Sequence, residues 1–253
     1  MRAAAVDVRG LRRAQGGRPL LDGLDLRVPV GARLLVVSRP EESASLLLRV
    51  LAGLARPSAG TVLLAGLSRA DDSAAGWARR VAYLGPEPGL YPWLSPNEAL
   101  DLAGRLAGYD RAERRRRIEA ATERFRLGSG VDRPISRGGA ALAQKTSLAA
   151  AMLTEPEVLL LDEPLRAVDP LERSRLLRMP GRRTTVLLAS HLPASEAGLM
   201  NQVALLRDGR LALHAPVVDL DQAGLPPSLR GIEALADLRA ASQPAGAPAS
   251  APG

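Results

Sequence analysis

The sequence predicts an α/β fold in which a largely parallel sheet is buried on both faces and an antiparallel β layer is added at the N-terminus. Two observations lead to this prediction. Continuous apolar runs of strand length alternate with helical patterns, which is typical of strands covered by helices on both sides. Residues 1–37 instead alternate polar and apolar side chains, as small antiparallel strands do.

The order of the elements follows from the same patterns. A polar loop after residue 37 leads into a buried helix over residues 43–54, and a highly charged helical segment covers residues 97–127. A glycine-rich loop spans residues 128–141, and Asp208-Gly209 predicts a hairpin turn. In chain order, we expect strands at residues 5–8, 24–30, 33–37, 61–64, 81–84, 158–161, 185–189, 203–206 and 211–213.

Two charged or biased segments need separate interpretation. The arginines at positions 114–117 lie in a helical pattern, and we expect them on a solvated face, one that could approach lipid headgroups. Residues 240–253 are rich in alanine, proline, glycine and serine, so we expect a disordered tail from about residue 240.

Composition excludes several classes of site. The 253 residues include no cysteine and two histidines, which excludes disulfides, thiolate metal sites and a histidine-rich metal centre. No window resembles a signal-peptide core or holds ~18 unbroken apolar residues. We therefore expect a cytoplasmic chain whose membrane role, if it has one, depends on a partner.

The net charge of +7 comes almost entirely from arginine, since Lys145 is the single lysine. This bias is more typical of a GC-rich genome than of an anionic partner. Aromatic residues make up 2% of the chain, so it lacks the rings on which single-stranded nucleic acids stack. Nucleic-acid binding is the least favoured function.

The motifs that carry chemistry begin with two carboxylates, Asp162 and Glu163, at the end of an apolar strand. Alone, this pattern is compatible with a strand that ends in a polar turn. It is followed by Asp169 between a valine and a proline, and by a further apolar strand that ends in Ser190-His191. Upstream, Ala52-Gly53-Leu54 closes the helix that follows the first strand–loop unit.

In this order and spacing, the motifs resemble those of the ATP-binding subunits of ABC transporters, over roughly residues 1–225. The resemblance implies a P-loop NTPase-like core with an N-terminal antiparallel β layer and an inserted helical subdomain at about residues 92–145. Residues 226–253 would be a C-terminal extension. The segment 83–94 is most similar to ABC-2-type exporters, which hints at export.

The resemblance also implies ATP and Mg²⁺ as cofactors, held between two ATP-binding subunits in a homo- or heterodimer, and a transmembrane permease as partner. The chain would then lie at the inner face of the membrane. By matching the family motifs, Asp162 and Ser45 correspond to magnesium ligands, Glu163 to the general base, and His191 to the γ-phosphate sensor. Asp169 corresponds to the dimer-contacting D-loop.

The phosphate-binding loop departs from the family pattern G-x-x-x-x-G-K-[ST], in which glycines aim backbone N–H groups at the phosphates and lysine neutralises them. The matching residues are Ser38, Arg39, Pro40, Glu41, Glu42, Ser43, Ala44 and Ser45. Serines replace both glycines of the motif, Glu41 replaces a further one, and Ala44 replaces the lysine. A non-glycine residue forced to positive φ costs about 1–2 kcal/mol, so we expect the loop to follow another path.

Other family positions are altered too. Pro86, with Glu87 beside it, matches the Q-loop glutamine, and Gln15 matches the adenine-stacking aromatic residue. The signature motif matches Gly138, Gly139, Ala140 and Ala141, or in another register residues 136–139. Arg39 is a poor substitute for the missing lysine because it lies five residues early, and Lys145 lies downstream on a different face.

The leading hypothesis is an ABC-type subunit that binds and hydrolyses ATP weakly or not at all and docks on a membrane-spanning partner. An active ATPase with an atypical phosphate loop remains open because Asp162, Glu163 and His191 are present. A non-transport scaffold or regulator built on the same fold is a third possibility.

Overall fold

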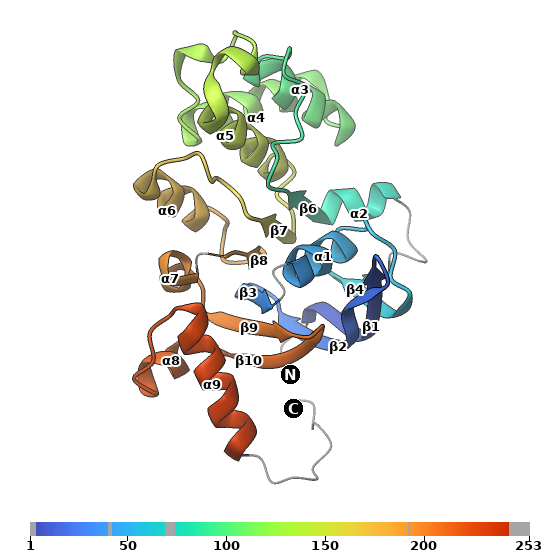
Figure 1. Ribbon diagram of the computed structural model, residues 1–253. Helices are drawn as coiled ribbons and strands as arrows, with labels where there is room; N and C mark the ends of the chain where they lie inside the picture. The colour runs from blue at the N-terminus through green and yellow to red at the C-terminus, as the bar shows by residue number, and fades with distance from the viewer. Residues whose placement is uncertain (1–3, 40–41, 69–73, 192, 243–253) are drawn as a thin grey trace.

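The computed structural model describes residues 4–39, 42–68, 74–191 and 193–242 (Figure 1). Its central sheet has the strand order β10-β9-β3-β8-β7-β6. The pairs β9–β3, β3–β8, β8–β7 and β7–β6 are parallel, and β10 is antiparallel to β9. The strands are β3 (Arg33–Arg39), β6 (Val81–Leu84), β7 (Val158–Asp162), β8 (Thr185–Ala189), β9 (Gln202–Arg207) and β10 (Arg210–Pro216). The largely parallel sheet expected from the apolar runs is confirmed.

A second, antiparallel sheet has the order β2-β1-β4-β5 and confirms the expected N-terminal layer. Its strands are β1 (Ala4–Gln15), β2 (Arg18–Pro29), β4 (Ala59–Leu64) and β5 (Leu67–Ser68). Helix α1 (Glu42–Leu51) contacts β2 of this sheet and β3, β7 and β8 of the central one (Figure 1). Leu47, Leu48 and Leu51 are fully buried there, so α1 and the end of β3 are firmly held by packing.

The helical segment lies at one end of the molecule (Figure 1). It contains α3 (Pro96–Leu106), α4 (Arg111–Arg124) and α5 (Gly139–Met152). Ser95 begins α3 with a capping box to Glu98. The loop expected over residues 128–141 is shorter, because two 3₁₀ turns (Gly128–Gly130 and Ile135–Arg137) fill it and α5 begins at Gly139.

The expectation that arginines 114–117 form one solvated face is wrong for two of the four. Arg114 donates to Asp101 at 2.8 Å, and Arg117 donates to Glu113 at 2.6 Å and stacks on the ring of Tyr109. The side chains of residues 115 and 116 are 83% and 77% exposed. Four consecutive helical residues span more than one full turn, so they cannot share one face.

The remaining helices are α2 (Ala74–Arg80), α6 (Pro170–Arg178), α7 (Pro193–Glu196), α8 (Val218–Gln222) and α9 (Leu229–Ser242). Helix α9 packs on β9 and β10 and buries Ile232, Leu235 and Ala236 in the core. It continues through residues 240–242, where disorder was expected, and the rest of that tail lies outside the described residues. None of the described helices has the length and apolarity needed to cross a membrane.

Candidate functional site

The predicted site residues gather at the carboxyl ends of β3, β7 and β8, where open α/β sheets bind ligands. Ser38 is the next-to-last residue of β3 and Ser45 lies on α1, while Glu163 and His191 follow β7 and β8. These residues line a cavity of about 30 Å³, which we call the loop cavity. It has room for about two water molecules. Among the described residues that line it, none is a lysine or an arginine.

Inside the phosphate-binding loop, the chain satisfies its own backbone. The N–H of Ala44 donates to the Ser38 hydroxyl across 3.0 Å, and both residues are buried. In the family pattern this N–H belongs to the lysine that faces the phosphates. The Ser43 hydroxyl is fully buried and finds no hydrogen-bond partner within the described part of the chain. Pro40 and Glu41, predicted to disturb the loop, lie outside the described residues.

Asp162 is 2% exposed, and each of its carboxylate oxygens accepts a hydrogen bond. Ser45 donates to Oδ1 at 2.7 Å and Tyr83 donates to Oδ2 at 2.9 Å. Burial and the neighbouring Asp162 charge raise the pKa of the Tyr83 phenol above its usual value, so it stays a proton donor. Sequence reasoning missed Tyr83, because a tyrosine within a buried strand looks like a core residue.

Glu163 and His191 are in direct contact. Oε1 of Glu163 accepts the backbone N–H of His191 at 2.7 Å, and Nδ1 of the histidine lies 2.5 Å from Oε2. Glu163 adopts a positive φ of 50°, a conformation that costs about 1–2 kcal/mol for a residue other than glycine. The strand end therefore turns sharply and directs this carboxylate toward the end of β8.

A buried ion pair lies near these strand ends, and no sequence motif indicated it. Glu196 on α7 is 1% exposed and pairs with Arg173 on α6. Burial raises the pKa of Glu196 above its usual value, although the Ser190 hydroxyl and Arg173 oppose the change. The pair joins the helix after Asp169 to the segment after His191.

The remaining predicted residues lie apart from the loop cavity. Asp169 is exposed and begins α6 by accepting the N–H of Glu172 at 3.0 Å. Glu87, Gly139 and Ala140 line a second cavity of about 440 Å³. Ala141 follows them on α5, Gly138 precedes this helix, Pro86 lies beside Glu87, and exposed Gln15 ends β1.

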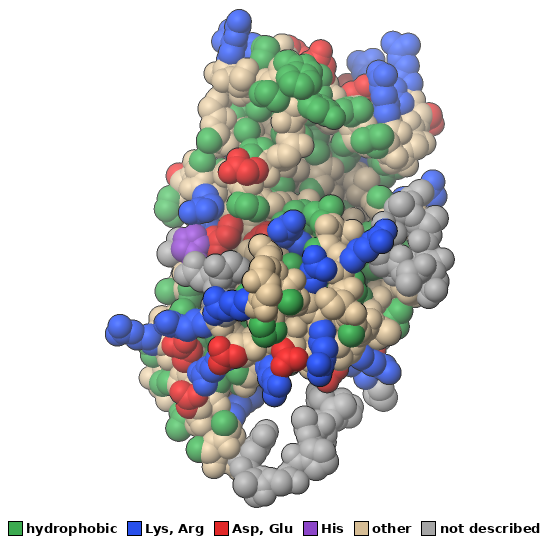
Figure 2. All heavy atoms as spheres, turned by 45° about the vertical axis from the view of Figure 1, so that its right-hand side comes forward, with side chains coloured by type: hydrophobic (Ala, Val, Ile, Leu, Met, Phe, Trp, Pro, Cys, Tyr) green, Lys and Arg blue, Asp and Glu red, His purple; other side chains and the backbone are tan. Residues whose placement is uncertain are grey.

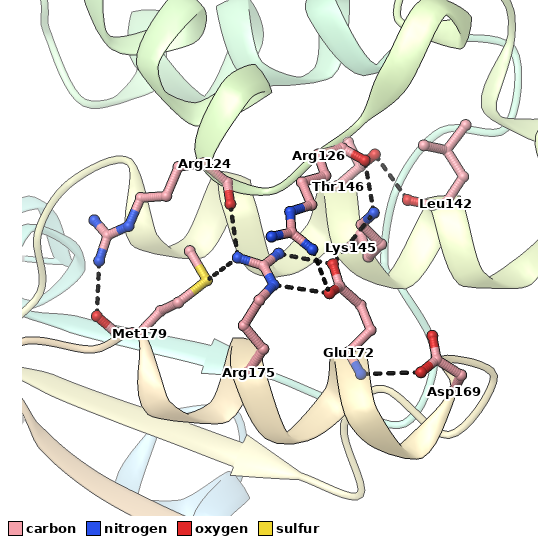
Figure 3. A network of polar contacts seen from close by, with 9 residues as sticks. All are labelled: Arg124, Arg126, Leu142, Lys145, Thr146, Asp169, Glu172, Arg175 and Met179. Atoms are coloured by element: carbon pink, nitrogen blue, oxygen red, sulfur yellow. Dashed lines mark hydrogen bonds and ion pairs between the residues drawn. The ribbon is translucent and has the colours of Figure 1, made fainter.

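The two cations considered as replacements for the missing lysine are both engaged elsewhere. Arg39 forms an ion pair of 2.5 Å with Glu233 on α9. Lys145 donates to the carbonyl oxygen of Arg126 at 2.6 Å and lies 3.7 Å from Glu172 (Figure 3). Glu172 also accepts two hydrogen bonds of 2.7 Å from Arg175, which lower the pKa of its carboxyl group. The single lysine therefore joins the helical segment to α6.

On the side that carries the antiparallel sheet, basic side chains alternate with acidic and apolar ones (Figure 2). The described side chains of this face form no continuous basic stripe of the kind that follows a nucleic-acid backbone.

Comparison with known proteins decides the family. A family model described as ABC transporter matches residues 21–166, more than half of the chain. This chain belongs to the ABC transporter family. Its architecture is that of the ABC nucleotide-binding domain, as the motif order predicted.

Relatives match this ABC-type chain over most of its length. It is 35% identical over 246 residues to the aliphatic sulfonates import ATP-binding protein SsuB of Mycobacterium sp. (strain MCS), covering 94% of this chain and 92% of the relative. It is 37% identical to SsuB 1 of Frankia alni, covering 84% and 75%. A solved ATP-binding subunit of an ABC transporter superposes with a TM-score of 0.80 at 26% identity, covering 92% and 99%. Both named relatives are import proteins, whereas segment 83–94 had hinted at export.

Proposed function

We propose that this chain is the ATP-binding-type subunit of an ABC importer and that its own phosphate loop binds Mg-ATP weakly or not at all. The observation that carries the proposal is the hydrogen bond from the Ala44 N–H to the Ser38 hydroxyl. A donor that would face a phosphate is already used inside the loop, and this same position carries alanine in place of the lysine that would neutralise the phosphates.

The residues present do not fit a bound triphosphate and its magnesium ion. The loop cavity holds about two water molecules, and its described lining supplies the Glu163 carboxylate but no lysine or arginine. The described lining therefore holds no lysine or arginine to neutralise the phosphate charge. Both oxygens of Asp162 already accept protein hydroxyls. We therefore assign no hydrolytic step to this site.

Import, the substrate class and the partners are inferred from the relatives. The SsuB proteins are named for importing aliphatic sulfonates, and the match covers most of both chains. We infer that this chain docks on a transmembrane permease at the cytoplasmic face and pairs with a second ATP-binding subunit. A competent partner subunit would supply the hydrolysis, because two copies of this chain would carry the same altered loop.

A second candidate is an ATPase with an atypical loop, favoured by the contact between Glu163 and His191. In that case the complex with its permease hydrolyses ATP, and Glu163→Gln abolishes turnover. A scaffold without a transport role would instead recover only soluble partners in a pull-down.

The test of the main proposal is a calorimetric titration of the purified chain with Mg-ATP. We expect no saturable binding up to about 1 mM, whereas Ser38→Gly/Glu41→Gly/Ser43→Gly/Ala44→Lys restores the motif and binds at least about tenfold more tightly. The matched control adds Ser45→Ala to the restored protein and weakens its binding again. Micromolar binding by the unaltered chain contradicts the proposal.

A further inference from the structure

The C-terminal helix α9 reaches the loop cavity. Its first residue, Leu229, lines the cavity together with residues from the end of β3 and the start of α1. Three apolar residues further along α9 anchor the helix, since Ile232, Leu235 and Ala236 are at most 5% exposed. A side chain far along the sequence thus joins the apolar part of the lining, beside Val37 and Ala189, while serines, Glu163 and His191 form the polar part.

The start of α9 is fixed independently of the cavity. A Cβ atom on Gly231 would stand 1.9 Å from the carbonyl oxygen of Pro226, so the chain is tightly folded just before the helix. The Gly231 N–H donates to the Ser228 hydroxyl at 3.3 Å. Leu229 is therefore held in place by its own helix as well as by the cavity.

The same helix also engages the cation of the phosphate loop. Arg39, the last residue of β3, forms an ion pair of 2.5 Å with Glu233, whose side chain is 21% exposed. The N–H of Asp208 donates to the Arg39 carbonyl oxygen at 3.1 Å, which holds the backbone at this point. The guanidinium is consequently directed at α9, away from the loop cavity.

We propose that α9 is an intramolecular cap on the loop cavity, in which Leu229 closes the cavity wall and Glu233 holds Arg39 outside it. This proposal adds to the proposed function by naming the helix that covers the altered loop. It depends on the proposed function in one respect only, namely that the unaltered chain binds nucleotide weakly.

The first test is hydrogen exchange of the backbone amides of residues 43–48 in the full chain, compared between unaltered protein and Leu229→Ala/Glu233→Gln. We expect exchange about fivefold faster in the double variant, the scale expected when one exposed ion pair and one partly buried leucine are lost. The matched control is Asp237→Asn, which removes the 2.8 Å ion pair between α9 and Arg207 without touching the cavity. Equal exchange in all three proteins overturns the cap.

The second test is Mg-ATP affinity, measured with a fluorescent analogue. The double variant is expected to show saturable binding at concentrations where the unaltered chain shows none, and the gain disappears when Arg39→Gln is added. If the double variant and the unaltered chain bind Mg-ATP equally and their amides exchange at equal rates, the proposal is overturned. If the double variant loses its circular-dichroism signal, Glu233→Gln alone replaces it in both tests, because its side chain is partly exposed and its loss leaves the core intact. Tight binding by the unaltered chain refutes the proposed function, while the ratio of the two affinities still tests the cap.

Discussion

The N–H of Ala44 donates to the hydroxyl of Ser38 across 3.0 Å, so the loop before α1 caps its own helix. Loss of such a cap costs about 1 kcal/mol. We expect Ser38→Ala to lower the free energy of unfolding by about this amount, measured by urea denaturation. Ser58→Ala, at an exposed turn position, serves as control and leaves the midpoint in place. Equal midpoints for the two variants would show that the cap contributes nothing.

Glu172 joins the helical segment to α6 through Arg175 and Lys145 (Figure 3). Its side chain is 16% exposed, and hydrogen bonds between charged groups contribute about 1.5–3 kcal/mol. We expect Glu172→Gln to reduce stability by about 1–2 kcal/mol in chemical denaturation. The matched control is Glu119→Gln, whose ion pair with Arg115 is exposed and whose loss has no measurable effect.

The effect of Glu172 should also depend on pH. Its pKa is lowered in the folded chain, chiefly by the hydrogen bonds from Arg175. Its contribution is therefore fully present above the unfolded value of about 4.3 and is lost as the pH falls through the folded value. The stability difference between unaltered protein and Glu172→Gln should shrink below about pH 4, as chemical denaturation over a pH series can measure. A constant difference down to pH 2 would exclude this ionic contribution.

Gly31 turns the chain between β2 and β3 at a φ of 76°, and a Cβ atom there would stand 2.5 Å from the carbonyl oxygen of Arg182. Gly16 has a φ of 57° and no atom within 4 Å of the same position. Alanine at either site meets the backbone cost of about 1–2 kcal/mol. We expect Gly31→Ala to destabilise the protein by at least about 1 kcal/mol more than Gly16→Ala, measured by thermal unfolding. Equal losses would mean that the neighbouring backbone moves without cost.

His214 in β10 is partly buried beside Gln202, and burial lowers the pKa of its imidazole. The unfolded chain therefore binds a proton at about pH 6.5 that the folded chain binds only at lower pH. Stability should fall as the pH drops below about 6.5, and His214→Gln should make the slope between pH 7 and pH 5 shallower. The raised pKa of Glu196 affects both proteins alike, so it cancels in the comparison.

The central parallel strands could be predicted because β7, β8 and β9 are largely continuous apolar runs, and motif spacing brought Asp162, Glu163 and His191 to neighbouring strand ends. The sequence also predicted an altered phosphate loop, but not that Ser38 would itself fill the donor position of Ala44. That hydrogen bond depends on how the end of β3 meets the start of α1, which no local pattern encodes.

Pairs between distant residues could not be predicted. Arg39 with Glu233 and Arg173 with Glu196 each join separate elements, and charge alone does not select one partner among many. The prediction that arginines 114–117 share one solvated face was wrong for a related reason. A run of identical residues carries no amphipathic signal. The orientation of these arginines is decided by Asp101 on the neighbouring helix α3 and by Glu113 one turn earlier on α4 itself.

Helix α9 emerges from the ribosome long after β3 and α1, because it lies about 180 residues further along the chain. Nascent chains fold from the N-terminal side as they lengthen, and contacts between distant segments form late. During translation, Arg39 therefore lacks its acidic partner until α9 has been synthesised. A chain cut after residue 228 would keep that arginine permanently unpaired with α9.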